Sequence, residues 1–198
     1  MVLLGILVCV FVIIQVVIRL GLSRIEQQPY SVDVKFRNFE IRKYPEALVA
    51  VTVCTGNHFR QVARSGFSKI AQFIFGRNST GKKIAMTAPV RMEFGKENST
   101  IEFIMPASYS KTTLPQTLDE SVQIKTWAGG YYAAIKFGGF PSDEKIRKAT
   151  ETLKQALISN EISFEDLPKY LGYNPPYQIF FRRNEVILPV SPREGKMF

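Results

Sequence analysis

The chain has 198 residues, of which 45% are hydrophobic and 22% charged, and its formal net charge is +9. This length allows one domain and hardly two, and the composition excludes a disordered chain. Two cysteines and one histidine exclude a disulfide scaffold and a metal site built from clusters of these residues. The basic balance attracts anions, but no run of five basic residues occurs, which argues against a nucleic-acid partner.

Residues 1–22 are predicted to form a membrane anchor. Val2–Ile18 carries no charged side chain, and Gln15 is its only strongly polar one. Continued to Leu22, the stretch is long enough to cross a hydrocarbon core of ~30 Å as a helix. It lacks the basic start and the small-residue exit of a cleavable signal peptide, so we expect it to be retained.

Flanking charge predicts a single-pass protein with its body in the cytoplasm. The residues after the anchor carry the positive charge, as the positive-inside rule expects of a cytoplasmic side. Two glycosylation sequons, at 78–80 and 98–100, would require a secretory lumen and leave the opposite orientation open. The basic residues are Arg19, Arg24, Lys35 and Arg37.

Residues 23–29 are interpreted as a linker and 30–198 as a single domain. Cys9 lies in the anchor, so Cys54 has no obvious disulfide partner. We therefore expect Cys54 to be a small buried apolar residue.

The body of the chain repeats itself. Phe39–Gly56 and Val122–Gly139 both have β-type composition and align without a gap at an offset of 83 residues. Tyr44-Pro45-Glu46 predicts a turn within the first segment. The matching pairs are Ile41 and Ile124, Arg42 and Lys125, Tyr44 and Trp127, Ala50 and Ala133, and Gly56 and Gly139.

Each repeat continues with a helix and then two strands. Apolar residues at i, i+3, i+4 and i+7 predict one helix from Phe59 to Ile74 and another from Ile146 to Leu157. Asn57 and Ser142 are the expected N-caps, and Gly76 is expected to end the first helix. The predicted strands are Lys83–Glu93, Thr100–Pro106, Tyr170–Gly172 and Tyr177–Val190, with loops at Lys96–Ser99 and Tyr109–Glu120. Two β-α-β-β halves indicate an α+β fold, a distorted antiparallel β-barrel flanked by two helices.

Several motifs of the body occur together in a recognisable order. Phe39–Tyr44 is similar to "YEIRxY", and Lys83–Val90 to "KIxMTxPV". Gly172–Pro176 is similar to "GYxPP", and Arg183–Val186 to "RNEV". Between the first two lie Gly66-Phe67 and Ile74–Asn78, which match a first helix and its "GxN" exit. From Tyr30 to Val190 the chain therefore resembles the SOUL/haem-binding protein family.

The resemblance implies a non-catalytic protein that binds haem or a free porphyrin reversibly, in a shallow apolar groove at the first helix. A porphyrin offers a flat apolar face, and its two propionates need cationic or hydrogen-bonding partners. The residues implied for this site are Arg64, Phe67, Ala71, Gln72, Phe75, Tyr177, Gln178 and Arg182.

The chain departs from its relatives at several of these positions. Gln72 and Gln178 stand where some relatives have lysine, and Arg182 together with Arg183 would supply the missing positive charge. Lys43 stands where some members carry a histidine proposed as an axial iron ligand. The one histidine, His58, starts the first helix and is either a weak ligand candidate or a solvated helix-start residue.

An enzymatic role has little support in the sequence. The carboxylates Glu40, Glu93, Glu102 and Asp119 are scattered, and no Gly-rich phosphate loop occurs. Two other functions remain open: a protein-interaction scaffold that kept the fold and lost the ligand, and a binder of another amphipathic small molecule.

Overall fold

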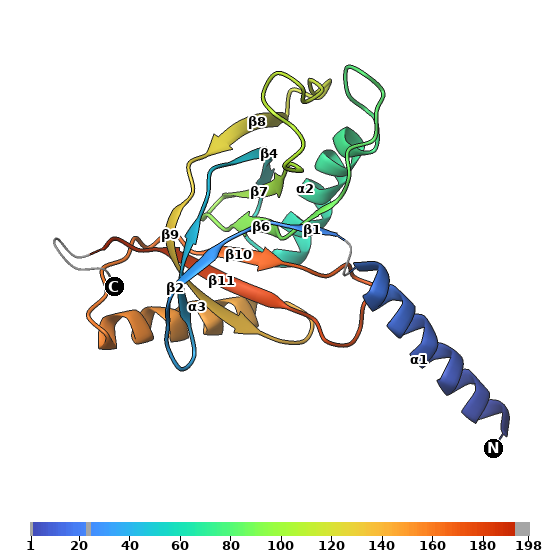
Figure 1. Cartoon of the computed structure of the whole chain (residues 1–198), viewed down its shortest axis with the longest axis horizontal. Helices are drawn as coiled ribbons and strands as arrows, with labels where there is room; N and C mark the ends of the chain where they lie inside the picture. Colours follow the sequence, from blue (N-terminus) through green and yellow to red (C-terminus); the bar gives the residue numbers. More distant parts are fainter. Residues whose placement is uncertain (1, 23–24, 193–198) are drawn as a thin grey trace.

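A computed structural model of the chain describes residues 2–22 and 25–192, with side chains at only part of the N-terminal helix. The described residues form three helices, a large sheet and a small strand pair (Figure 1). The helices are α1 (Val2–Leu22), α2 (Phe59–Ile74) and α3 (Asp143–Ser159). The large sheet contains β2 (Ser31–Lys35), β3 (Glu40–Tyr44), β4 (Ala47–Thr55), β6 (Val90–Glu93), β7 (Asn98–Ile104), β8 (Val122–Trp127), β9 (Gly130–Phe137), β10 (Lys169–Gly172) and β11 (Asn184–Pro189). β1 (Glu26–Gln27) and β5 (Thr87–Ala88) form the parallel pair.

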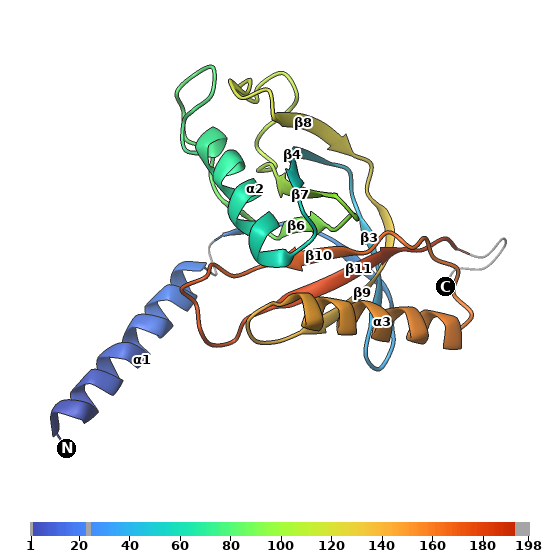
Figure 2. The same ribbon diagram turned by 180° about the vertical axis from the view of Figure 1, so that it is seen from behind.

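The large sheet is antiparallel and curled, in the order β2-β3-β9-β11-β10-β6-β7-β4-β8. The antiparallel α+β class is thus confirmed. The predicted barrel is not: β2 and β8 are the two edges of the described sheet, which forms half a barrel. Figures 1 and 2 show this curl from two sides.

The predicted internal repeat is confirmed, because β3, β4 and α2 recur as β8, β9 and α3. The halves nevertheless exchange their first strands. β3 pairs with β9, with Ile41 opposite Ala133, and β8 pairs with β4, with Ile124 opposite Ala50. The turn after Tyr44 therefore does not close a hairpin, since β3 and β4 lie in different parts of the sheet.

Helix ends follow the sequence in part. Ser142 caps α3, its hydroxyl accepting from the Lys145 N–H at 3.3 Å, as predicted. Gly76 follows α2 with φ +113°, a left-handed conformation that suits glycine and ends the helix. The predicted cap Asn57 is wrong, because its amide donates to the Lys96 carbonyl.

Two predicted strands are too long. Within Lys83–Glu93 only β5 and β6 form, on either side of the cis Ala88–Pro89 peptide. Within Tyr177–Val190 the strand begins only at Asn184, and residues 173–183 form a loop, called the β10–β11 loop below. Within the described ranges, this loop pairs with no neighbouring strand: side-chain hydrogen bonds hold it, together with two backbone bonds of its own, from the Tyr173 N–H to the Arg183 carbonyl and from the Gln178 N–H to the Pro175 carbonyl.

α2 and α3 pack against the same face of the sheet (Figure 2). Gly66 brings α2 close to the strands, since a Cβ there would lie 2.4 Å from Ile101 Cγ2 and 2.8 Å from Cys54 Sγ. Cys54 is buried in this core, as predicted. α3 contributes Leu153 and Leu157 to the same core.

α1 projects from the body of the molecule (Figure 1). Among the described residues, none of the helices is both long enough and apolar enough to cross a membrane. Residues 26–28, in the predicted linker, lie against the domain: β1 pairs with β5, and Gln28 is buried.

Candidate functional site

One exposed face of α2, together with its C-cap residue, carries half of the residues predicted for a ligand site. Arg64, Phe67, Ala71 and Phe75 follow one another at intervals of three, four and four residues, which places them on one side of the helix. We call these four residues the α2 stripe. Phe67 is 41% exposed and Phe75 56% exposed. Two solvent-facing phenyl rings with a small alanine between them make a shallow apolar surface.

The helix that carries the α2 stripe is basic, with Asp119 as a nearby carboxylate that interacts with the charges of Lys69 and Arg77. α2 carries Arg60, Arg64 and Lys69 and no acidic residue. Gln72 lies beside the stripe, and its Oε1 accepts a hydrogen bond from Arg77 Nη1 at 2.5 Å. A flat apolar anion would therefore meet an apolar face with positive charge around it.

α3 provides an internal comparison, because it occupies the equivalent place in the second half of the repeat. The positions 83 residues after the α2 stripe are Arg147, Thr150, Lys154 and Ile158, and none is aromatic. Lys154 is bound to acids, with its Nζ 2.7 Å from Asp166 Oδ1, and the hydrogen bond to Asp166 raises its pKa. The exposed aromatic pair is thus a property of α2 and is absent from the equivalent positions of α3.

The other predicted site residues lie in the β10–β11 loop. Tyr177 is 60% exposed, whereas Gln178 is buried and hydrogen-bonds Asn174 and the Phe180 carbonyl. In the described part of the chain, the structure shows no hydrogen bond that joins this group to the α2 stripe.

Arg182 organises the same loop. Its guanidinium donates to the carbonyl oxygens of Asn174, Pro175 and Gln178 at 3.1, 2.7 and 2.6 Å, and it lies 4.6 Å from the centre of the Phe140 ring. Burial lowers the pKa of Arg182. The Arg182 N–H groups, which were predicted to bind a propionate, therefore donate to backbone carbonyls of the loop.

His58 is the N-cap residue of α2 and is largely exposed. Its Nδ1 lies 3.4 Å from Asp143 Oδ2, while Asp143 Oδ1 accepts from the Phe59 N–H at 2.6 Å. A carboxylate from α3 thus caps α2. This geometry favours the solvated helix-start interpretation of His58, and no cluster of three or more potential metal-ligating His, Cys, Asp or Glu side chains occurs among the described residues.

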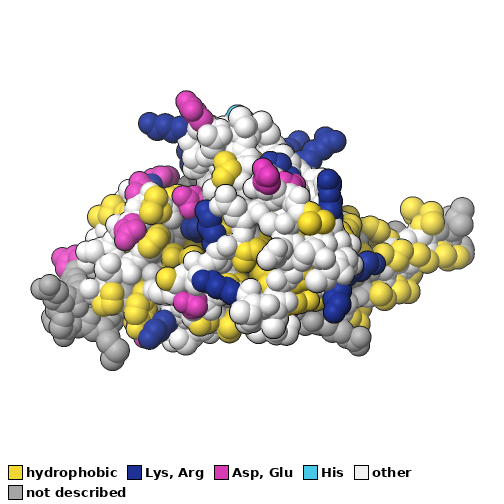
Figure 3. All heavy atoms as spheres, turned by 90° about the horizontal axis from the view of Figure 1, so that it is seen from above, with side chains coloured by type: hydrophobic (Ala, Val, Ile, Leu, Met, Phe, Trp, Pro, Cys, Tyr) yellow, Lys and Arg dark blue, Asp and Glu magenta, His cyan; other side chains and the backbone are white. Residues whose placement is uncertain are grey.

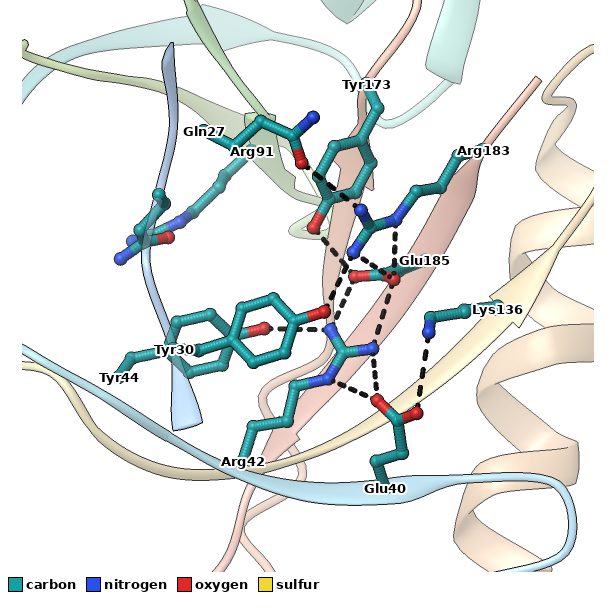
Figure 4. Close-up of polar contacts among 11 residues, drawn as sticks. Gln27, Tyr30, Glu40, Arg42, Tyr44, Arg91, Lys136, Tyr173, Arg183 and Glu185 are labelled. Carbon is teal, nitrogen blue, oxygen red and sulfur yellow. Dashed lines mark hydrogen bonds and ion pairs between the residues drawn. The ribbon is translucent and has the colours of Figure 1, made fainter. Parts of the chain in front are cut away.

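The sequence motifs meet at a place that sequence reasoning missed (Figure 4). Arg42 and Glu185 form a fully buried bidentate pair, with Nη1–Oε2 and Nη2–Oε1 distances of 2.7 and 3.2 Å. Tyr173 donates its hydroxyl to Glu185 at 2.8 Å, and Arg183 Nε donates to the same carboxylate at 3.0 Å. The "YEIRxY", "GYxPP" and "RNEV" motifs thus converge on one carboxylate.

Burial and charge oppose each other in this network. Burial raises the pKa of Glu185, but the hydrogen bonds and charge of Arg42, with help from Arg183 and Tyr173, bring it below its usual value. Burial likewise opposes the charge of Arg42, whose pKa is nevertheless raised by Glu185. Burial raises the pKa of Tyr44, which accepts from Arg42, to about 12. The pKa shifts of Arg42 and Glu185 favour the charged forms of both groups, so the two side chains form an ion pair at neutral pH.

A second buried cluster lies on neighbouring strands. The Arg91 guanidinium lies 3.7 Å from the Trp127 ring centre, 3.4 Å from Glu102, and against the side-chain oxygen of Gln28. Lys169 Nζ pairs with Glu102 at 2.6 Å. The alternation of polar and apolar residues along each strand was the available signal, since it places these charges on the sheet face opposite the helices.

Comparisons with known proteins identify a family and related folds. A family model described as "SOUL heme-binding protein" matches residues 25–189. The chain is 30% identical to "Heme-binding protein 2" of Homo sapiens over 76% of this chain and 77% of that protein. It is 24% identical to "Heme-binding protein 1" of Xenopus laevis over 75% and 81%, respectively. It also resembles the solved structure described as "Crystal structure of EcmrR C-terminal domain", with a TM-score of 0.60, 14% identity and coverage of 82% of this chain and 98% of the other; this likeness shows the fold alone.

Proposed function

Because the chain belongs to the SOUL heme-binding protein family, we propose that it binds haem or a free porphyrin reversibly on the α2 stripe, without catalysing a reaction. The observation that carries this proposal is the exposed pair Phe67 and Phe75 on a helix without acidic residues. Its curated relatives are named heme-binding proteins, and the repeat-related helix α3 lacks the aromatic pair.

The residues of the stripe fit the macrocycle and its propionates better than the iron. Phe67 and Phe75 offer ring faces to a flat apolar ligand, and Arg64, one turn before Phe67, is placed to bind a carboxylate. None of the residues proposed for the site on α2 is a histidine, cysteine or methionine, the side chains that commonly ligate haem iron. We therefore expect apolar contact and charge, rather than iron ligation, to supply the affinity.

A titration of the full chain in lipid nanodiscs tests the function. Haem and iron-free protoporphyrin would each be added, with Soret absorbance and quenching of Trp127 as readouts and empty nanodiscs as the control for lipid uptake. Saturable one-to-one binding of both ligands is expected. Absence of saturable binding would overturn the proposal and favour the scaffold alternative.

A variant pair locates the site. Phe75 and Ile158 occupy equivalent positions of the repeat and are both exposed, at 56% and 59%. Phe75→Ser should weaken binding of both porphyrins, and Ile158→Ser should leave it unchanged. Equal effects of the two substitutions would remove the α2 stripe from the site.

We further propose that the whole sequence 1–22, of whose side chains the structure describes only part, anchors the domain to a membrane through α1, with the body on the cytoplasmic side. The charge-free sequence Val2–Ile18 and the exposed apolar side chains described along α1 support this, and Figure 3 shows them as an apolar projection from a body that carries many lysines and arginines. Such an anchor would hold the site near the bilayer into which haem partitions. Extraction of membranes with alkaline carbonate tests it: retention in the pellet is expected, and release would exclude an inserted helix.

A further inference from the structure

The β10–β11 loop contacts the middle of α1. The Ile179 N–H donates to the side-chain oxygen of Gln15 at 3.1 Å, and the rings of Phe180 and Phe11 meet edge to face with centroids 6.1 Å apart. Gln15, the one strongly polar residue of Val2–Ile18, thus accepts a hydrogen bond from the backbone of the loop. These two contacts place the loop tip at the level of Phe11 and Gln15 along the helix axis.

The loop tip is apolar and exposed. Tyr177, Ile179, Phe180 and Phe181 are exposed by 60, 42, 49 and 78%, and residues 175–181 carry no charge. Exposed aromatic and aliphatic side chains gathered in one short loop mark an interaction surface. This surface is continuous with the exposed apolar side of α1 through the Phe11–Phe180 contact.

Part of the backbone of the loop is paired within the protein. In hydrocarbon, each unpaired N–H or C=O costs several kcal/mol, so irregular backbone enters a membrane only when its polar groups are satisfied. Arg182 and the Gln178 amide together bind the carbonyls of residues 174, 175, 178 and 180. The N–H groups of Gln178 and Ile179 donate to the Pro175 carbonyl and to Gln15. Pairing with backbone carbonyls is also how an arginine is accommodated near a membrane.

We infer that the β10–β11 loop enters the same lipid bilayer as α1 and forms a second contact of the domain with the hydrocarbon region. This inference rests on the proposed membrane anchor, because the depth of the loop follows from the depth of α1. A lipid bilayer is the occupant that fits, since the loop is uncharged from residue 175 to 181, continues the apolar surface of α1 and pairs several of its backbone carbonyls with Arg182 and Gln178. Tyr177, a residue predicted for the porphyrin site, then lies at the boundary between lipid and protein.

Quenching of tryptophan by lipids brominated on the acyl chain tests the inference on the full chain. Three single-tryptophan proteins would be made in a Trp127→Phe background and reconstituted in phosphatidylcholine–phosphatidylglycerol vesicles. Phe181→Trp reports the loop, Phe11→Trp reports α1, and Leu118→Trp, at a position 65% exposed on another loop, is the control.

The expected result is quenching of the tryptophans at 181 and 11 and none at 118. Quenching at 11 without quenching at 181 would overturn the inference and leave the anchor standing. Quenching at neither position would remove both the anchor and the loop contact. If Trp127→Phe fails to fold, the same three substitutions are read with Trp127 retained, as the difference from the parent chain.

Discussion

Arg42 and Glu185, separated by 143 residues, form a salt bridge in which both side chains are completely buried. It joins β3 of the first half of the repeat to β11 of the second, across the intervening strand β9. Three of the motifs that carry the family resemblance thus contribute residues to one buried structural network.

Removal of one partner of this pair should destabilise the protein strongly. Arg42→Ala leaves Glu185 as an uncompensated buried charge, and the free energy of unfolding should fall by about 3–5 kcal/mol. Lys136→Ala is the matched control, because Lys136 contacts Glu40 of the same network from an exposed position at 3.5 Å; its loss should change the stability by less than about 1 kcal/mol. Urea unfolding of both variants measures the difference, and equal effects would contradict the account.

Acid should destabilise the fold through the same carboxylate. The pKa of Glu185 is lowered in the folded state from its usual 4.5, so its contribution is fully present above pH 4.5. This contribution is lost as the pH falls from 4.5 through the lower folded-state pKa. Urea midpoints measured from pH 7 down to pH 3 should show the loss, and Glu185→Gln should flatten that profile. A variant that keeps the parent's slope would exclude Glu185 as its cause.

Charge at the α2 stripe should control porphyrin affinity. Arg64→Glu puts a carboxylate opposite a propionate and should weaken haem binding by about tenfold or more. Arg147→Glu makes the same change at the equivalent position of α3 and should have no effect. Soret titration of both variants checks the prediction, and an unchanged affinity of Arg64→Glu would place the propionates elsewhere.

A methyl group added at Gly66, where α2 approaches the sheet closely, should destabilise the protein. Gly66→Ala introduces a Cβ 2.4 Å from Ile101 Cγ2, and the resulting overpacking should cost about 1–3 kcal/mol. Gly138→Ala is the control, since its Cβ would meet nothing nearer than a carbonyl oxygen at 4.0 Å. The difference between their thermal midpoints measures the effect, and a stable Gly66→Ala protein would show that the helix can shift outward.

Local patterns in the sequence predicted the repeat, both helices and the α+β class, because each is encoded within a few turns or strands. The repeat was recognised by comparing two sequence segments, as in the alignment of Ile41 with Ile124, and the apolar period of α2 is local. Neither required knowledge of which distant residues are in contact in the fold. Phe67, however, shares that period and is exposed. The apolar side of α2 is wider than the part of the helix that the sheet covers.

The remaining features depend on contacts between distant segments. Residues 177–183 have the composition of a strand, but Arg182 binds the loop carbonyls and the ladder starts only at Asn184. The burial of Arg42 depends on Glu185, and no spacing rule reaches across 143 residues. Among the predicted site residues, the placement of Arg64, Phe67 and Ala71 on one side of α2 was readable from the helical period, whereas the structural roles of Gln178 and Arg182 were not.

The exchange of β3 and β8 ties the two halves of the chain together. β3 of the first half pairs with β9 of the second, and β8 of the second half pairs with β4 of the first. The two halves of one polypeptide are thus arranged like the subunits of a domain-swapped dimer. A fragment that ends in the loop before β8 would lack the strand that covers β4, and the remaining fragment would lack the strand that covers β9. The two fragments should therefore regain structure only when mixed.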